Sequence, residues 1–325
     1  MRKPTRWPIL LGAAFASVLA TLSVQAADYP RQNVRIIVPF AAGGSIDFIA
    51  RVGAKGLAEQ TGGSFTVENR PGASGKIGVT AVKQAAPDGY TLLLATSLTH
   101  GINPALIDDV GYDAVKDFAP AVLLGSNQIN VFVRSDLPAK SVSELVGLMR
   151  DKPGSLNYGT GGSGSANQMM VTVLLAQGKL PFTAAVAVPY GGEAPAFADM
   201  LGGRVQFMIT SGNKSHVDSG ALRVLATTGR KRSLVYPDSP TMTELGFDDV
   251  YYAGWYGLEA PLGTPKSILD TINAAAAKYL ARDDVKKLLA DNGFEAGGGG
   301  IDSFQKIISD DAAHWMRVVK QYNLK

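Results

Sequence analysis

Apolar runs and amphipathic stretches alternate along most of this chain. Short runs rich in β-branched and aromatic residues are typical of strands. They are Val34–Val38, Phe65–Glu68, Tyr90–Ala95, Ala121–Leu124, Asn130–Val133, Leu156–Tyr158, Ala185–Val188, Val205–Ile209, Leu222–Ala226 and Trp255–Glu259. Stretches with apolar positions three or four residues apart are typical of helices. They are Ile46–Glu59, Ser143–Arg150, Asn167–Ala176, Ala194–Leu201, Lys266–Leu280, Val285–Asn292 and Ile301–Tyr322. This alternation predicts an α/β fold with two mixed, mostly parallel sheets.

Two of the predicted strands run into glycine-rich turns that precede predicted helices. The first turn contains Gly43 and Gly44, and the second contains Gly159 and Gly164. Glycine has no Cβ to block a left-handed backbone or the close approach of a ligand. The N–H groups at a helix N-terminus attract anions. We expect two opposed anion-receptive turns, although the first also fits a plain βα connection without a ligand.

Two strand-like stretches flank the middle of the chain and are interpreted as crossovers between lobes. They are Asn127–Val133 and Tyr251–Glu259. The predicted first lobe combines residues 27–126 with 251–325, and the second lobe is 127–250. Two crossings make a hinge, and ligands then bind in the central cleft at the carboxyl ends of strands.

The N-terminus has the pattern of a secretory signal peptide, predicted over residues 1–26. A basic start precedes Ile9–Leu22, an uncharged apolar run of 14 residues, and small residues lead up to Ala27. The run is short of the ~20 residues that span a bilayer. We therefore expect an exported protein, and the absence of cysteine favours the periplasm over a disulfide-rich extracellular space.

Charge and composition exclude several classes of function. The formal net charge of +3 includes three basic residues of the predicted signal peptide, so the remaining 28 basic and 28 acidic residues balance. Nothing then favours nucleic acid as a partner. Without cysteine there is no thiolate nucleophile and no cysteine metal site.

The sequence carries little catalytic equipment. Gly159, Gly161 and Gly164 satisfy G-x-G-x-x-G, but no acidic residue follows until Glu193, so a dinucleotide site is disfavoured. No hydrolase or zinc-protease motif occurs. His100 and His216 have no evident acid partner, and His314 is expected to be an ordinary surface or packing histidine. We expect no metal and no cofactor. A binding protein is favoured, and an exported hydrolase or dinucleotide-dependent enzyme is the alternative.

Spaced segments over the whole mature chain resemble one family, the substrate-binding proteins of tripartite tricarboxylate transporters, also called the Bug family. The segments that carry the resemblance begin at Ile37-Val-Pro-Phe-Ala-Ala-Gly-Gly, Glu68-Asn-Arg-Pro-Gly, Ala86-Pro-Asp-Gly-Tyr, Asn103-Pro-Ala, Leu137-Pro-Ala-Lys-Ser, Asn157-Tyr-Gly, Val188-Pro-Tyr, Leu201-Gly-Gly, Asp238-Ser-Pro-Thr and Ala260-Pro-Leu-Gly-Thr-Pro.

The resemblance implies a type II periplasmic binding protein fold and a receptor that captures a small carboxylate for a membrane permease. It implies that the main chain of the first glycine loop, Phe40 to Asp47, holds the carboxylate. Three positions depart from the family pattern, namely Gln168, Gly191 and Glu193. They disfavour a highly charged tricarboxylate and favour a monoacid, an aromatic acid or an uncharged polar ligand.

The predicted ligand-binding residues come from these loops and from the ends of neighbouring strands. They are Phe40, Ala42, Gly43, Gly44, Asp47, Ser97, Thr99, Asn103, Tyr158, Gly159, Thr160, Ser163, Gly164, Tyr190, Gly191, Gly192, Thr210 and Ser211. Asp47 either orients the glycine loop, binds an ammonium group, or is an ordinary acid in the first turn of a helix. We expect Arg51 to pair locally and Asn69 to brace the turn that follows it.

The expected partners are a small carboxylate ligand and the permease subunits of a tripartite transporter, and the chain is expected to be a monomer. A sensor receptor that docks to a signalling protein would use the same cleft, so it stays as an alternative. The ligand itself is not specified by the sequence.

Overall fold

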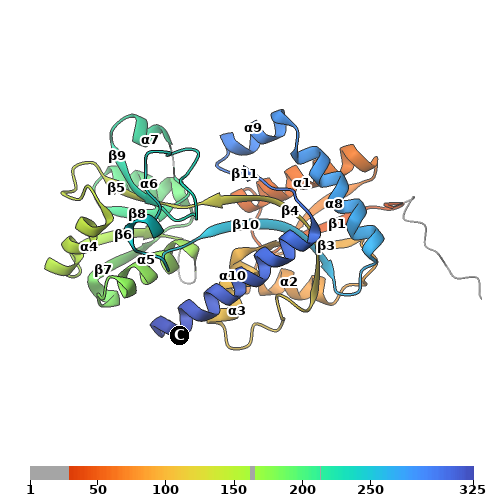
Figure 1. The fold of residues 1–325 in the computed structure, drawn as a ribbon, viewed down its shortest axis with the longest axis horizontal. Helices are drawn as coiled ribbons and strands as arrows, with labels where there is room; N and C mark the ends of the chain where they lie inside the picture. The colour runs from red at the N-terminus through yellow and green to blue at the C-terminus, as the bar shows by residue number, and fades with distance from the viewer. Residues whose placement is uncertain (1–28, 162–164, 213) are drawn as a thin grey trace, which may run out of the picture.

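The chain folds into two α/β lobes that lie side by side (Figure 1). The computed structural model describes residues 29–161, 165–212 and 214–325, so the predicted signal peptide lies outside the described residues. A six-stranded sheet with the order β11-β4-β10-β3-β1-β2 forms the first lobe. A five-stranded sheet with the order β7-β6-β8-β5-β9 forms the second.

The strands of the first sheet are β1 (Val34–Val38), β2 (Phe65–Asn69), β3 (Thr91–Thr96), β4 (Phe118–Gln128), β10 (Ala253–Pro261) and β11 (Glu295–Ala296). Those of the second are β5 (Asn130–Arg134), β6 (Leu156–Thr160), β7 (Ala185–Pro189), β8 (Phe207–Thr210) and β9 (Leu222–Thr227). Both sheets are mixed, as predicted. Parallel pairing joins β1 to β2 and β3, and β6 to β7 and β8. The other pairings are antiparallel, so the parallel share is smaller than expected.

The helices cover the faces of these sheets. They are α1 (Ser45–Thr61), α2 (Lys76–Lys83), α3 (Asn103–Leu106), α4 (Val142–Asp151), α5 (Ala166–Gln177), α6 (Glu193–Leu201), α7 (Lys214–Asp218), α8 (Lys266–Leu280), α9 (Asp283–Asp291) and α10 (Ile301–Tyr322). Short turns of 3-10 or π helix are η2 (Ala73–Gly75), η3 (Leu98–Ile102), η4 (Phe182–Ala184) and η5 (Thr243–Leu245). Among the described residues, no helix is both long enough and apolar enough to cross a membrane.

Two long antiparallel strands, β4 and β10, lead from the first sheet to the second lobe (Figure 1). One residue separates the end of β4 from the start of β5, and the last residue of β4 pairs with Ala253 at the start of β10. The carboxyl end of β3 lies at the same place, because Thr96 pairs with Tyr256. In the second sheet, Thr210 at the carboxyl end of β8 pairs with Asn130 at the start of β5. The loops that follow the parallel strands of both sheets therefore face the boundary between the lobes.

The C-terminal helix α10 contributes to the cores of both lobes. Its first half packs Phe304 and Ile308 against the first sheet. Its second half places Trp315, Val318 and Val319 in the core that surrounds β5, β6 and β8. The helix thus crosses from one lobe to the other, as its path in Figure 1 shows.

Candidate functional site

The loop between β1 and α1 presents an uncapped helix N-terminus to the boundary between the lobes. Gly43 has a φ of +87°, a left-handed conformation that favours glycine. Gly44 is the N-cap residue of α1 and supplies no side-chain hydrogen bond. A Cβ built on Gly43 or Gly44 would meet nothing within 4 Å, so the backbone is open to solvent. The first N–H groups of a helix have no partner inside it, and here they are available to an anion.

Asp47 is buried beneath this loop and holds its shape. Its Oδ2 accepts hydrogen bonds from the backbone N–H of Gly43 at 3.0 Å and from Nε of Arg51 at 2.8 Å. Its Oδ1 accepts from Nδ2 of Asn69, which also donates to the carbonyl of Phe40, each at 3.0 Å. The side chain of Asp47 therefore orients the glycine loop, and the local pairing expected of Arg51 is confirmed.

The same contacts explain the acidity of Asp47 and correct one assignment. The hydrogen bond from Arg51, followed by those from Gly43 and Asn69, lowers the pKa of Asp47 to about 2 although burial opposes the shift. Asn69 was expected to brace the Pro71-Gly72 turn, but its amide instead ties β2 to the glycine loop. No local pattern indicates this role, because the contact joins residues far apart in sequence.

The carboxyl ends of β6, β7 and β8 form the matching face of the second lobe. Thr160 and Ser165 join their hydroxyl groups at 2.9 Å, and the N–H of Tyr190 donates to the carbonyl of Thr160 at 2.8 Å. Ser165 caps α5, because its Oγ accepts from the N–H of Gln168. The predicted residues Ser163 and Gly164 fall in the part of this loop that lies outside the described residues.

A second turn on this face begins α6. Gly191 and Gly192 are exposed, and a Cβ on either would meet nothing within 4 Å. Glu193 then opens the helix, and its Oε1 accepts hydrogen bonds from the hydroxyl of Thr210 and from the N–H of Ser211. Sequence reasoning did not include Glu193 among the ligand contacts, although it noted this position as a departure.

The aromatic residues predicted at the site differ in position. Phe40 is half-buried against the first-lobe core, beside the glycine loop. The hydroxyl of Tyr190 donates to Asp199 Oδ2 at 2.8 Å, which turns this side chain toward α6. Tyr158 lies in the second-lobe core with its ring centroid 5.5 Å from that of Phe207. A ligand contact is therefore best supported for Phe40, and it stays a prediction for all three.

Three predicted polar contacts after β3 are committed to the interior of the protein. Ser97 Oγ donates to Asp311 Oδ2 at 2.7 Å, and Asn103 Nδ2 donates to the carbonyl of Ser74 at 2.7 Å. Thr99 Oγ1 lies 2.9 Å from Nδ1 of His100. The segment that carries these side chains follows the end of β3 at the boundary between the lobes. A ligand role for them therefore stays a prediction.

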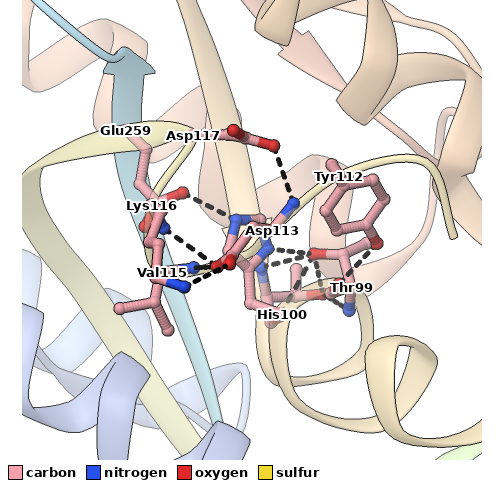
Figure 2. A network of polar contacts seen from close by, with 9 residues as sticks. Thr99, His100, Tyr112, Asp113, Val115, Lys116, Asp117 and Glu259 are labelled. Carbon is pink, nitrogen blue, oxygen red and sulfur yellow. Dashed lines mark hydrogen bonds and ion pairs between the residues drawn. The ribbon is translucent and has the colours of Figure 1, made fainter.

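These contacts belong to a buried polar cluster that the sequence did not indicate. Figure 2 shows His100 between Thr99 and Glu259 of β10, with the hydroxyl of Tyr112 donating to the carbonyl of Thr99. His100 Nε2 lies 2.8 Å from Glu259 Oε2, and both side chains are almost fully buried. His100 is therefore a structural residue of the first lobe, fixed to a partner that no sequence spacing could identify.

A cavity of about 610 Å³ has none of the described glycine-loop residues in its lining, although Tyr158 and Gln168, which line it, are close in sequence to the second loop. It is lined by one side of α5, by the exposed edge strand β7 and by the last three residues of the chain. Tyr158 is the single predicted site residue among its lining residues. The described residues contain no group of three or more acidic or histidine side chains placed to hold a metal ion.

Comparisons with known proteins bear on this arrangement. The sequence model of a family described as "Tripartite tricarboxylate transporter family receptor" matches residues 49–324. Protein BugT of Bordetella pertussis is 31% identical over 99% of this chain and 98% of its own length. The structure titled R. palustris Rpa4515 with adipate is 32% identical with a TM-score of 0.78, covering 91% of this chain and 99% of that one. MatC (Rpa3494) from Rhodopseudomonas palustris with bound malate is 30% identical with a TM-score of 0.76, covering 90% and 100%.

Proposed function

Because the chain belongs to the tripartite tricarboxylate transporter receptor family, we propose that it captures a small organic acid and delivers it to the permease subunits of such a transporter. The observation that carries the proposal is the open N-terminus of α1, held in place by Asp47 and free of a side-chain cap. Two relatives of this fold are described with adipate and with malate, both dicarboxylates.

In this proposal the ligand lies between the lobes, with one carboxylate on the backbone of Gly43 and Gly44. The loops at Thr160, Gly191 and Ser211 face it from the second lobe. The first lobe comprises residues up to about 126 and from about 251, and the middle segment forms the second, whose core also takes up the second half of α10. Domain closure about β4 and β10 would then bring the two sets of loops onto the ligand.

The setting of the receptor follows from the same proposal. Residues 1–26 direct export, and the mature chain acts as a monomer in the periplasm. Because the family consists of transport receptors, ligand binding without a chemical reaction is favoured over the alternative of an exported enzyme. The permease is favoured as partner over a signalling protein for the same reason.

A thermal-shift screen of the mature chain against organic acids, amides and pyridine carboxylates tests the ligand class. Linkage predicts about 2.7 kcal/mol of stabilisation at a ligand concentration of about 100 Kd. We expect carboxylates to raise Tm. The proposal is refuted if every acid leaves Tm unchanged while a neutral solute raises it.

The variant Gly44→Leu tests whether the first loop receives the acid. A Cβ at Gly44 has open space and its φ is −88°, so the substitution should fold normally and yet obstruct the N–H groups of α1. We expect at least a tenfold loss of affinity, about 1.4 kcal/mol. Gly147→Leu in α4 is the matched control, because its Cβ also meets nothing within 4 Å. Equal affinity of the Gly44 variant and the control would show that this loop does not line the site.

A further inference from the structure

The two helices that open on the boundary between the lobes differ in local charge. The N-terminus of α1 has no side-chain cap, and the carboxylate of Asp47 beneath it is occupied by Arg51, Asn69 and the N–H of Gly43. The N-terminus of α6 instead begins with an exposed carboxylate, Glu193. The N-terminus of α6 also lacks a side-chain cap, so the two helix ends differ in the exposed carboxylate of Glu193 and not in their N–H groups.

The carboxylate of Glu193 is fixed at the end of β8. Its Oε1 accepts hydrogen bonds from the hydroxyl of Thr210 and from the N–H of Ser211. Among the described residues, no donor is recorded within hydrogen-bond distance of Oε2. Thr210 is fully buried and pairs with Asn130 at the crossover into the second sheet. The charge is thus held at the edge of the sheet that faces the first lobe.

The electrostatic influence of Glu193 extends to the crossing strands. Burial first, and the charge of Glu193 in addition, raise the pKa of the Tyr256 hydroxyl to about 12 although a hydrogen bond to Asn127 opposes the shift. Tyr256 lies on β10, and its hydroxyl donates to Asn127 Oδ1 of β4 at 3.2 Å. The geometry agrees, because Glu193 is hydrogen-bonded to Thr210, and Thr210 pairs with Asn130 next to the end of β4.

No cation offsets this charge among the proposed ligand contacts. The eighteen predicted binding residues include neither lysine nor arginine. A second carboxylate on a ligand would approach Glu193 without a compensating positive charge, and like charges brought together in a partly desolvated site repel strongly. A hydroxyl, amide or ammonium group could instead donate a hydrogen bond to the free side of this carboxylate.

We propose that Glu193 determines specificity, so that the site binds acids whose far end donates a hydrogen bond and rejects dicarboxylates of the same length. The inference rests on the proposed function, since it requires a first carboxylate at the α1 N-terminus. It separates this chain from the two relatives described with adipate and with malate.

Calorimetric titration of the mature chain with length-matched ligands tests the proposal. One set is succinate, succinamate and γ-aminobutyrate, and the other is adipate, adipamate and ε-aminocaproate. We expect the amide or ammonium acid of one set to bind at least about tenfold more tightly than the dicarboxylate. Glu193→Gln keeps an oxygen for Thr210 and Ser211 but removes the charge, and should move the preference at least about tenfold toward the dicarboxylate.

Two variants control for stability and net charge. Glu193→Asp retains the charge and should retain the discrimination, which separates loss of charge from disturbance of α6. Asp151→Asn makes the same change in net charge at the exposed last residue of α4 and should leave the ratio of affinities unchanged.

The outcomes separate a failure of the inference about Glu193 from a failure of the proposed function. If carboxylates bind and Glu193→Gln behaves like Asp151→Asn, the inference is wrong and the proposed function stands. If the wild type already prefers the dicarboxylate of both sets, the inference is also wrong. If none of the six compounds binds to the wild type or to Glu193→Gln, and the wider acid screen is also negative, both fail.

Discussion

Replacing Asp311 by asparagine should change how the stability of this protein depends on pH. Asp311 Oδ2 accepts hydrogen bonds from Ser97 Oγ at 2.7 Å and from Nε1 of Trp255 at 2.9 Å. Ser97, Trp255 and Trp315 are almost fully buried. Burial raises the pKa of Asp311 from 3.8 to about 6, although these hydrogen bonds favour the charged form.

The sign of the effect follows from linkage between protonation and folding. Because its pKa is higher in the folded state, Asp311 favours folding most below pH 3.8, and this contribution is lost as the pH rises through 6. The interval from 3.8 to about 6, at 1.36 kcal/mol for each pH unit, corresponds to about 3 kcal/mol. The residue is partly accessible to water, and screening reduces the value, so we expect about 2 kcal/mol.

His314 acts in the opposite direction over the same range. Burial, with the nearby charge of Arg317, lowers the pKa of His314 from 6.5 to about 4. Stability linked to His314 is therefore present above pH 6.5 and is lost as the pH falls through 4. The two residues partly cancel in the wild type, so the informative quantity is the difference in unfolding free energy between Asp311→Asn and the wild type at each pH.

Urea unfolding measured from about pH 3 to pH 8 gives this difference. We expect it to move by about 2 kcal/mol in favour of the variant between pH 4 and pH 6 and then to level off. In Asp311→Asn, an amide NH2 group replaces one carboxylate oxygen and cannot accept a hydrogen bond from an indole N–H. This loss lowers the unfolding free energy of the variant by a similar amount at every pH. The slope is therefore the test, not the absolute value.

Intrinsic fluorescence supplies a direct second measurement. Trp255 donates to Asp311, Trp315 lies one turn further along α10, and the remaining tryptophan, Trp7, lies in the predicted signal peptide. Emission of the folded mature chain should titrate with a midpoint near pH 6, and Asp311→Asn should lose this transition. A free-energy difference that is constant between pH 4 and pH 7, or one that favours the wild type as pH rises, would refute the reasoning.

Two further substitutions test packing and the glycine loop. In Gly56→Ala the new Cβ would lie 2.3 Å from Cδ1 of the buried Tyr279 ring, so we expect urea unfolding to show a loss of about 1–3 kcal/mol. Gly147→Ala has open space and should gain up to about 1 kcal/mol, and equal signs for the two would contradict the packing argument. Asp47→Asn should be less stable than the wild type at neutral pH and should approach it as the pH falls through 2, where the pKa of Asp47 lies. A difference that persists unchanged at low pH would show that ionised Asp47 does not support the loop.

Every predicted strand and helix has a counterpart in the structure. β1, α8 and α10 also have the predicted bounds, because β1 is a compact apolar run before a turn and the apolar positions of the two helices follow a helical period. The turn at Gly43 and Gly44 was found for a similar reason. Its glycines and the helix that follows are local features.

The missed features depend on contacts between distant segments. The short helices η3 and α3 are stabilised by hydrogen bonds from Tyr112 to Thr99 and from Asn103 to Ser74. Because these contacts come from other segments, the local sequence did not predict the helices. His100 reaches its acidic partner Glu259 through the pairing of β10 with β3, which no local spacing encodes. Polar side chains that seemed suited to a ligand were therefore partly committed to the interior.

Because α10 completes the core of the second lobe, this lobe is not an independent folding unit. Trp315, Val318 and Val319 complete a hydrophobic core whose other members come mostly from the middle of the chain. Arg317 adds an ion pair to Asp249 at 2.7 Å. A fragment ending before these residues would lack one wall of its interior, so the last turns of the chain must arrive before the middle segment can be complete. The two lobes share this helix and are built as a single cooperative molecule.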